Sequence, residues 1–228
     1  MIMKKMMMIA ALMVATLTAN AQFEPGTWSI QPKAGFNISK ISNLPSLPLN
    51  FVGNDEIKST FRGGFVIGGE FEYQVAKNFS LAAGLTYSNQ GSQWENYELK
   101  IAGKTYEAKD IQIELSYIDL PVVANVYLFK GFALKAGVQL GYLASAKFKA
   151  TTKEENITTN YEVSGRSGLH KWDISIPVGA SYEFQKVPIV IDARYNIGVS
   201  KLNEENIDGM KDARNHMVQV TVGYKFSL

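Results

Sequence analysis

The sequence predicts an all-β fold, an eight-stranded antiparallel up-and-down transmembrane β-barrel. Eight segments alternate apolar and polar residues with a period of two, which is the pattern of strands with one apolar face. In the parts of these segments that would cross a membrane, the apolar face carries no Lys, Arg, Asp or Glu. The connections between the segments alternate between long and short, as they do in up-and-down barrels with short turns at one end.

The N-terminus reads as a cleaved leader rather than as part of the barrel. Lys4 and Lys5 precede an apolar run at residues 6–18, and Ala19-Asn20-Ala21 matches an A-x-A cleavage site. A membrane-spanning helix is the alternative, but the run is well short of the roughly 20 residues that a span needs. We therefore expect a secretory signal peptide at residues 1–21 and a single barrel domain at residues 22–228.

Composition narrows the chemistry of the exported chain. The full sequence has 23 Lys and Arg against 21 Asp and Glu, and the leader holds two of the lysines and no acid. The remaining chain is therefore balanced in charge, which gives no reason to expect a nucleic-acid partner. The sequence contains no cysteine, which excludes disulfides, thiolate metal sites and a cysteine nucleophile.

The first four strands are expected at residues 27–39, 61–74, 79–90 and 111–129. Pro32 in the first strand is typical of an edge or a strand start. In the fourth strand the apolar residues are odd-numbered up to Leu115 and even-numbered from Ile118 onward. The change of phase near Tyr117 fits either a β-bulge or an extracellular part whose inner face is apolar.

The last four strands are expected at residues 132–149, 172–184, 189–200 and 214–228. Short turns fall at residues 75–78, 130–131 and 185–188, and long connections at 40–60, 91–110, 150–168 and 201–213. Residues 91–110 themselves suggest a hairpin with a turn at 102–104. Since outer-membrane barrels have short periplasmic turns and longer outer loops, we expect both termini to lie in the periplasm.

The placement of charge favours a membrane barrel over a soluble sandwich. A charge on the lipid face costs about 2–4 kcal/mol near the bilayer centre, whereas a soluble sandwich would carry its charges on the outer faces. Aromatic residues also gather near strand ends, as interfacial girdles do. They are Trp28, Phe61, Tyr73, Phe79, Tyr87, Phe132, Trp172 and Phe184.

If the apolar face meets lipid, the polar face lines the lumen. The positive residues assigned to it are Lys33, Arg62, Lys135, Lys147, Lys149, Arg194 and Lys225. The negative ones are Glu70, Glu72, Asp119, Asp173, Glu183 and Asp192. Eight strands enclose a space just wide enough for side chains, so we expect a lumen filled by ion pairs instead of an open channel. The predicted structural network comprises Arg62, Glu70, Glu72, Asp119, Lys135, Asp173, Glu183, Asp192 and Arg194.

No catalytic, cofactor-binding or metal-ligating residue is predicted. His170 lies close in sequence to Ser175, but their opposite parities put them on opposite faces of a strand, so a hydrolase arrangement is disfavoured. Two histidines and no cysteine also argue against a transition-metal site.

Four stretches of the sequence carry two resemblances. Residues 221–228 resemble the C-terminal insertion signal of bacterial outer-membrane barrels. Residues 33–37 (KAGFN), 115–121 (LSYIDLP) and 193–198 (ARYNIG) resemble the PorT-like outer-membrane β-barrel family of Bacteroidota. That resemblance covers nearly the whole exported chain and implies an integral eight-stranded barrel of the outer membrane. It brings no catalytic motif, and some members of the family are linked to secretion or to accessory roles in envelope complexes.

The functional hypothesis is a non-enzymatic outer-membrane barrel that is a structural or accessory subunit of an envelope complex. Its partners would be outer-membrane lipid, an envelope protein bound through the long outer loops, and the barrel-assembly machinery, which would recognise Phe226 and Leu228. A narrow channel for small solutes and an outer-membrane lipid or peptide hydrolase are the alternatives. The sequence leaves the partner, the substrate and the oligomeric state open.

Overall fold

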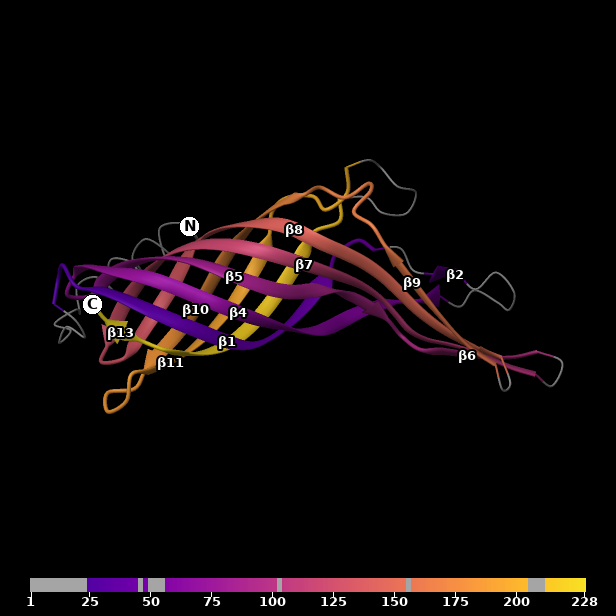
Figure 1. Ribbon diagram of the computed structural model, residues 1–228, viewed down its shortest axis with the longest axis horizontal. Coiled ribbons are helices and arrows are strands. Elements are labelled where there is room, and N and C mark those ends of the chain that lie inside the picture. The colour runs from indigo at the N-terminus through magenta and orange to yellow at the C-terminus, as the bar shows by residue number, and fades with distance from the viewer. Residues whose placement is uncertain (1–23, 45–46, 49–55, 102–103, 155–156, 205–211) are drawn as a thin grey trace, which may run out of the picture.

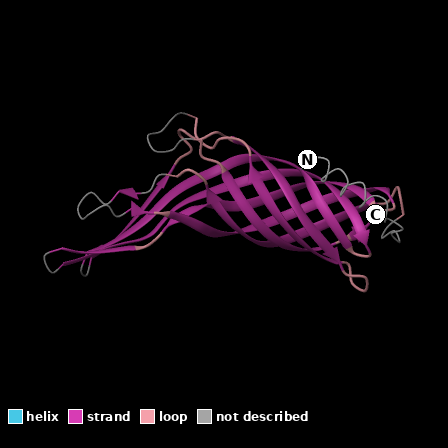
Figure 2. Cartoon of the chain, turned by 180° about the vertical axis from the view of Figure 1, so that it is seen from behind, coloured by secondary structure: helices cyan, strands magenta, loops and turns pink. Residues whose placement is uncertain are grey.

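The structure, a computed structural model, describes residues 24–44, 47–48, 56–101, 104–154, 157–204 and 212–228. The expected signal peptide at residues 1–21 lies outside this range. The strands are β1 Trp28–Ile41, β2 Leu47–Pro48, β3 Glu56–Ile57, β4 Ser59–Ala76, β5 Phe79–Trp94, β6 Tyr97–Ile101, β7 Lys104–Phe129, β8 Phe132–Glu154, β9 Ile157–Ser164, β10 Trp172–Glu183, β11 Ile189–Gly198, β12 Asn215–Tyr224 and β13 Phe226–Ser227. Figure 2 shows that strands and their connections make up the described chain.

Eight of the described strands close into a ring. Its order is β1-β4-β5-β7-β8-β10-β11-β12, every neighbouring pair is antiparallel, and β12 pairs back onto β1. The short strand β13 also pairs with the start of β1. The predicted all-β fold with eight antiparallel strands is therefore confirmed, and Figure 1 shows the strands inclined to the long axis of the barrel. Within the described residues, no helix is long and apolar enough to cross a membrane.

The barrel is apolar outside and polar inside. On β12, Val218, Val220 and Val222 are about half exposed, while the alternating Gln219 and Thr221 are buried. Large apolar side chains are exposed in the same way on the other strands of the ring. This pattern is the reverse of that in a soluble protein. It is the pattern of a membrane barrel, in which successive side chains of a strand face lipid and lumen in turn. We call this outward-facing surface the apolar band.

Aromatic pairs mark both edges of the apolar band. Near the short turns, the paired rings are Trp28–Tyr73, Phe129–Phe132, Tyr182–Phe184 and Tyr224–Phe226, with centroids between 4.6 and 5.2 Å apart. At the opposite edge they are Phe65–Tyr87, Tyr142–Trp172 and Tyr195–His216. The Trp and Tyr rings among them are amphipathic and favour the membrane–water interface.

Strands β7 and β8 continue past the band and form an arm with β6 and β9. The order within the arm is β6-β7-β8-β9, all antiparallel, and Figure 1 shows it projecting from the end opposite the C-terminus. The hairpin expected at residues 91–110 corresponds to the pairing of β6 with β7, although part of its turn, 102–103, lies outside the described residues. The segment 150–168 differs from the expected polar connection, because β8 extends into it and β9 pairs with β8.

The change of phase on the fourth strand comes from a change in the interior. Strand β7 keeps a continuous register with β5 from Gln112 to Asp119, so Leu115, Tyr117 and Asp119 share the inner face, and all three are buried. The inner face thus switches from polar to apolar along a regular strand, which was one of the two interpretations. A register shift does occur here, but it lies on β8, where Ala144 is skipped between Leu143 and Ser145.

That apolar inner face belongs to a cap that closes the arm end of the barrel. The cap consists of Ile41, Leu115, Tyr117, Leu143, Ala146, Leu202 and Ala213, with Leu44, Ile113 and Leu169 packed against it. The connection after β11 is held over this end because Leu202 N donates to Ala213 O and His170 N donates to Leu202 O, both at 2.8 Å. Side chains from the strands of the ring and from its connections therefore fill the arm end of the barrel.

Candidate functional site in the barrel lumen

The lumen is the place where the fold concentrates polar chemistry. Inward positions of the ring are occupied by serine, threonine, amides and charged residues, most of them almost fully buried. An eight-stranded barrel leaves room only for side chains inside, so these groups have to satisfy one another. The charged groups form two clusters and a separate pair of carboxylates.

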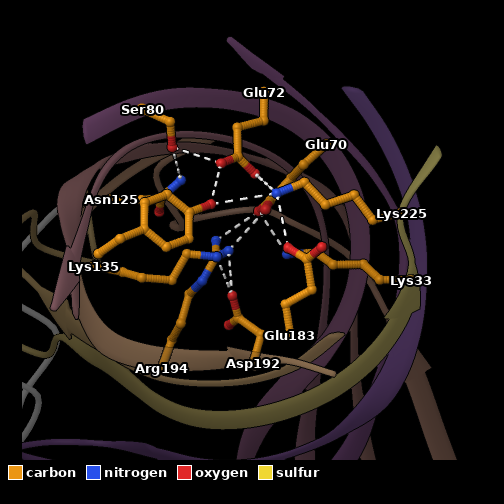
Figure 3. Close-up of polar contacts among 11 residues, drawn as sticks. Lys33, Glu70, Glu72, Ser80, Asn125, Lys135, Glu183, Asp192, Arg194 and Lys225 are labelled. Carbon is orange, nitrogen blue, oxygen red and sulfur yellow. Dashed lines mark hydrogen bonds and ion pairs between the residues drawn. The ribbon is translucent and has the colours of Figure 1, made fainter. Parts of the chain in front are cut away.

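The first cluster is centred on Glu70 (Figure 3). Arg194 on β11 donates two parallel hydrogen bonds to it, Nη1 to Oε1 at 2.6 Å and Nη2 to Oε2 at 2.8 Å. Lys33 on β1 approaches Oε1 from the other side, at 2.5 Å. Asp192 accepts from Arg194 at 2.7 Å and is also bonded by Lys135 on β8. Four strands distant in sequence are thus joined by charge-assisted bonds, the strong class of hydrogen bond.

The second cluster surrounds Lys225, which lies at the break between β12 and β13. Its ammonium is 2.9 Å from Glu72 Oε2 and 3.2 Å from Glu183 Oε2. The other oxygen of Glu72 accepts from Ser80 at 2.6 Å and from the hydroxyl of Tyr127. Tyr127 is a member of this cluster that the sequence analysis did not name, although it shares the polar parity of Asp119 on the same strand.

Together the two clusters are electrically neutral. Among the described residues they contain four cations (Lys33, Lys135, Arg194 and Lys225) and four carboxylates (Glu70, Glu72, Glu183 and Asp192). A neutral set of paired ions crosses the lumen in Figure 3. Removing one partner of such a buried pair leaves an uncompensated charge. The stability of each pair therefore depends on the others.

Asp119 and Asp173 stand apart from these clusters. Asp119 accepts a hydrogen bond from Ser88 Oγ at 2.6 Å, and Asp173 accepts one from Ser200 Oγ at 2.6 Å. Within the described part of the chain, neither carboxylate forms an ion pair with Lys or Arg. Both residues belong to the predicted lumen network by position, but the structure gives them hydroxyl partners in place of cations.

Three residues that the sequence analysis assigned to the lumen make their ion pairs elsewhere. Arg62 bonds to Glu114 at 2.8 Å, Lys149 approaches the same carboxylate at 3.0 Å, and Lys147 pairs with Glu162 on the arm. Glu114 alternates with the buried Leu115, so it lies on the outer side of β7.

A local irregularity of the sheet explains the errors at Lys147 and Lys149. A one-residue shift in a strand moves every following side chain to the other face. The shift at Ala144 on β8 turns Lys147 and Lys149 outward. Arg62 itself is buried and lies opposite the buried Ser39 of β1, and its ion pair with Glu114 lies beside a second shift, between Phe61 and Val66, where β4 has an extra residue against β5. Apart from Arg62, which pairs with Glu114, the lumen charge is therefore not the balanced set that the sequence suggested, because the two clusters with Asp119 and Asp173 hold two more carboxylates than cations among the described residues.

The cluster at Glu114 lies past the apolar band. Outward residues of β7 change from Val122, Leu120 and Ile118 to polar Ser116 and Glu114. Burial acts to raise the pKa of Glu114, but a hydrogen bond from Lys149 and the charge of Arg62 outweigh it and hold that pKa below its ordinary value. This ionic patch suits the wet side of the membrane boundary.

The histidine and serine considered for hydrolysis are not brought together. Ser175 is buried in the lumen on β10, whereas His170 is exposed in the connection before that strand. His216 lies on the outer wall beside Tyr195, at the edge of the band.

Comparison with known proteins gives one family and several distant likenesses. A family model described as "Outer membrane protein beta-barrel domain" matches residues 20–204. Ail, the attachment invasion locus protein of Yersinia pestis, is 14% identical over 89% of this chain and 99% of its own, with a TM-score of 0.42. Neisserial surface protein A is 14% identical over 87% and 97%, with a TM-score of 0.42. The Escherichia coli outer membrane protease OmpT is 11% identical over 93% and 100%, with a TM-score of 0.32. No curated protein matches the sequence.

Proposed function

The chain belongs to the outer membrane protein β-barrel domain family, and on this premise we propose that it is a non-catalytic barrel that binds an envelope protein partner through its arm. The observation that carries the proposal is the arm itself, a four-stranded sheet continuing past the apolar band. Nothing in the transmembrane wall requires so long an extension of β7 and β8. An extension of this kind is suited to contacts outside the membrane.

The surface of the arm supports a binding role. All eight residues of β9 are exposed, including Ile157 at 70%, Tyr161 at 53% and Val163 at 64%. Apolar side chains on one face of an edge strand are a liability for a protein that stays alone. They are useful where a partner adds a strand to the edge and receives alternate side chains.

We propose that the arm faces outward and that the C-terminus faces the periplasm. The described short turns and the C-terminus lie at the end opposite the arm (Figure 1), and family barrels place short turns in the periplasm. Phe226 and Leu228 are exposed at that end, where assembly machinery could recognise them as the C-terminal signature implies.

A pore is less well supported because side chains fill the lumen at two levels along its length. The paired ions of the two clusters span its middle, and the apolar cap closes the arm end. A solute would have to break buried charge-assisted bonds and then cross packed apolar side chains. A hydrolase is also less well supported, since His170 and Ser175 lie apart.

The PorT-like resemblance leads to the finer proposal of an accessory role in a secretion-related envelope complex. Its most specific motif, 117–121, alternates Tyr117, Asp119 and Pro121 inside with Ile118 and Leu120 on the lipid side. The motif therefore belongs to the barrel wall and its interior, so within such a complex the arm would supply the contact.

Replacing the arm hairpins tests the proposal. Residues 98–107 and 152–159 are each replaced by Asn-Gly, which favours a tight hairpin turn, and folding is checked by the different gel mobility of unheated and heated barrel. A photo-crosslinking residue at Tyr161 should give a discrete adduct in intact cells, and the same residue at Val220 on the lipid face should not. The shortened barrel should fold and lose the co-purifying partner. Ion-conducting steps from the purified barrel, or no adduct from any arm position, would overturn the proposal.

A further inference from the structure

The two carboxylates without cationic partners lie in one row across three strands. Asp119 on β7 is directly opposite Gly141 on β8, and Gly141 is directly opposite Asp173 on β10. Directly paired residues of antiparallel strands point to the same side of the sheet. Asp119 and Asp173 therefore face the lumen side by side, with a glycine between them.

Because Gly141 has no side chain, the space between Asp119 and Asp173 is open to their carboxylates. A Cβ at this position would be 2.8 Å from Asp119 Oδ1 and 3.6 Å from the Cβ of Asp173. The Asp119 carboxylate thus leans over the glycine toward its counterpart. Any larger residue would collide with the Asp119 carboxylate, so the glycine keeps the space between the two aspartates open.

A buried hydroxyl adjoins the same row. Tyr117 is only 1% exposed, and its hydroxyl has no hydrogen-bond partner within the described structure. Its ring reaches to 3.2 Å from where a Cβ of Gly141 would stand, so Tyr117 lies beside the glycine that separates the two aspartates. A buried polar atom without a partner is rare and calls for an explanation.

The charges of the lumen supply that explanation. The ion clusters around Glu70 and Lys225 are neutral when they are taken together, so Asp119 and Asp173 add two negative charges that no described Lys or Arg offsets. Two carboxylates sharing a site away from bulk water repel each other strongly. One doubly charged ion would compensate both.

We propose that Asp119, Asp173 and Tyr117 form a binding site for a divalent cation of the hard, oxygen-preferring class, with Ca²⁺ as its representative. Carboxylates, hydroxyls and water are the ligands such ions take, in flexible coordination. No group of three or more His, Cys, Asp or Glu gathers within the described residues, so neutral oxygens and water would complete the shell. Asp173 is only partly buried, so this member of the site is not fully shut off from solvent.

The site goes beyond the proposed function and links two parts of the barrel. It lies between the ion clusters and the cap, and Tyr117 itself belongs to the cap. An ion here would tie β7 to β10 across β8. Bound cation should therefore stabilise the arm end of the barrel without affecting the binding surface on β9.

Terbium luminescence is the direct test, since Tb³⁺ replaces Ca²⁺ at oxygen sites and is sensitised by a nearby tyrosine. The purified, folded, detergent-solubilised chain is titrated with Tb³⁺ after treatment with a chelator. We expect one equivalent of Tb³⁺ per chain with sensitised emission, displaced by Ca²⁺ and not by Na⁺. Emission that never exceeds the free-ion level would overturn the proposal.

Matched variants assign the ion to the site. Asp119→Asn and Asp173→Asn keep side-chain volume and should weaken Tb³⁺ binding at least tenfold, while Tyr117→Phe should lose most of the sensitised emission. Glu162→Gln, an acid on the exposed arm, is the control and should bind as the original chain does. Equal binding by the double Asp variant would mean an ion held elsewhere and would refute the site. If a variant fails to fold, the stoichiometry of the unaltered chain and the displacement by Ca²⁺ still decide.

A stability measurement distinguishes a bound cation from protonation as the cause that relieves the repulsion between Asp119 and Asp173. If protons alone relieve the repulsion, thermal stability will rise on acidification and Ca²⁺ will change nothing at neutral pH, which would contradict the proposal. If the proposal holds, Ca²⁺ will raise the unfolding temperature at neutral pH, and Asp119→Asn will remove that increase.

Discussion

The barrel wall and the arm are built from the same two strands, β7 and β8, yet they follow opposite patterns. Within the apolar band, Ile118, Leu120 and Val122 face outward and Asp119 faces inward. Beyond the band, Glu114 faces outward and Leu115 faces inward. The chain keeps its period of two throughout, and only the surroundings change. The solvent outside the sheet therefore decides which parity is apolar: lipid selects apolar residues, and water selects charges.

The largest expected effect comes from breaking the ion cluster around Glu70. Glu70→Gln leaves Arg194 and Lys33 without their shared carboxylate. Losing one partner of a buried pair costs about 3–5 kcal/mol of folding free energy. Urea unfolding of the barrel in lipid vesicles measures this cost.

The comparison for that change is Glu114→Gln, which removes a carboxylate that also contacts two cations but on the outer side of the sheet. It should lower the free energy of unfolding much less. An equal loss of unfolding free energy in both variants would mean that ion pairs inside the lumen and on the outer side of the sheet contribute equally to stability, which would contradict the account.

The cap is the next most sensitive region. Leu143 is fully buried among Ile41, Leu115 and Leu202. Leu143→Ala should cost about 2–5 kcal/mol, as cavity-forming substitutions do. A cost near zero would show that the arm end is loosely filled, and a measurable ion current in this variant alone would show that the cap is the main seal.

A charge scan across the band edge sharpens the contrast. Leu120→Lys places a charge on the lipid face and should destabilise the barrel by about 2–4 kcal/mol. Val163→Lys makes the same kind of change on exposed β9 and should alter stability by less than about 0.5 kcal/mol. Comparable costs at the two positions would place the arm in lipid and refute the boundary.

The smallest effect concerns the ion pair between Lys147 and Glu162 on the arm. The hydrogen bond and charge of Lys147 lower the pKa of Glu162. A carboxyl with a lowered pKa adds stability above its unfolded pKa and loses it as pH falls through the folded value. Because both groups are exposed, Glu162→Gln should leave the unfolding temperature of the barrel unchanged at neutral pH and remove only a slight acid sensitivity.

The fold could be predicted in detail because lipid allows few exceptions. Every strand of the ring was found near its expected range, since an apolar outer face has to alternate strictly where no water is present. Glu70, Asp192 and Arg194 could also be assigned to the lumen by parity, because β4 and β11 run regularly through the band.

What could not be predicted depends on register. The skipped Ala144 leaves no mark in the sequence, yet it sends Lys147 and Lys149 outside. The row of Asp119, Gly141 and Asp173 exists only because three strands align at that level. A single sequence gives the face of each residue and not its height against neighbouring strands, so the excess of carboxylates stayed hidden behind an apparently balanced count.

Labelling of single cysteines on intact cells tests most directly the claim that the arm lies in water outside the cell while the band lies in lipid. The sequence contains no cysteine, so Tyr161→Cys on the arm, Val220→Cys on the band and Lys186→Cys in a short turn each introduce one reactive thiol. A membrane-impermeant maleimide should label only Tyr161→Cys. Labelling of Val220→Cys would contradict the lipid-facing wall, and labelling of Lys186→Cys with none of Tyr161→Cys would contradict the outward arm.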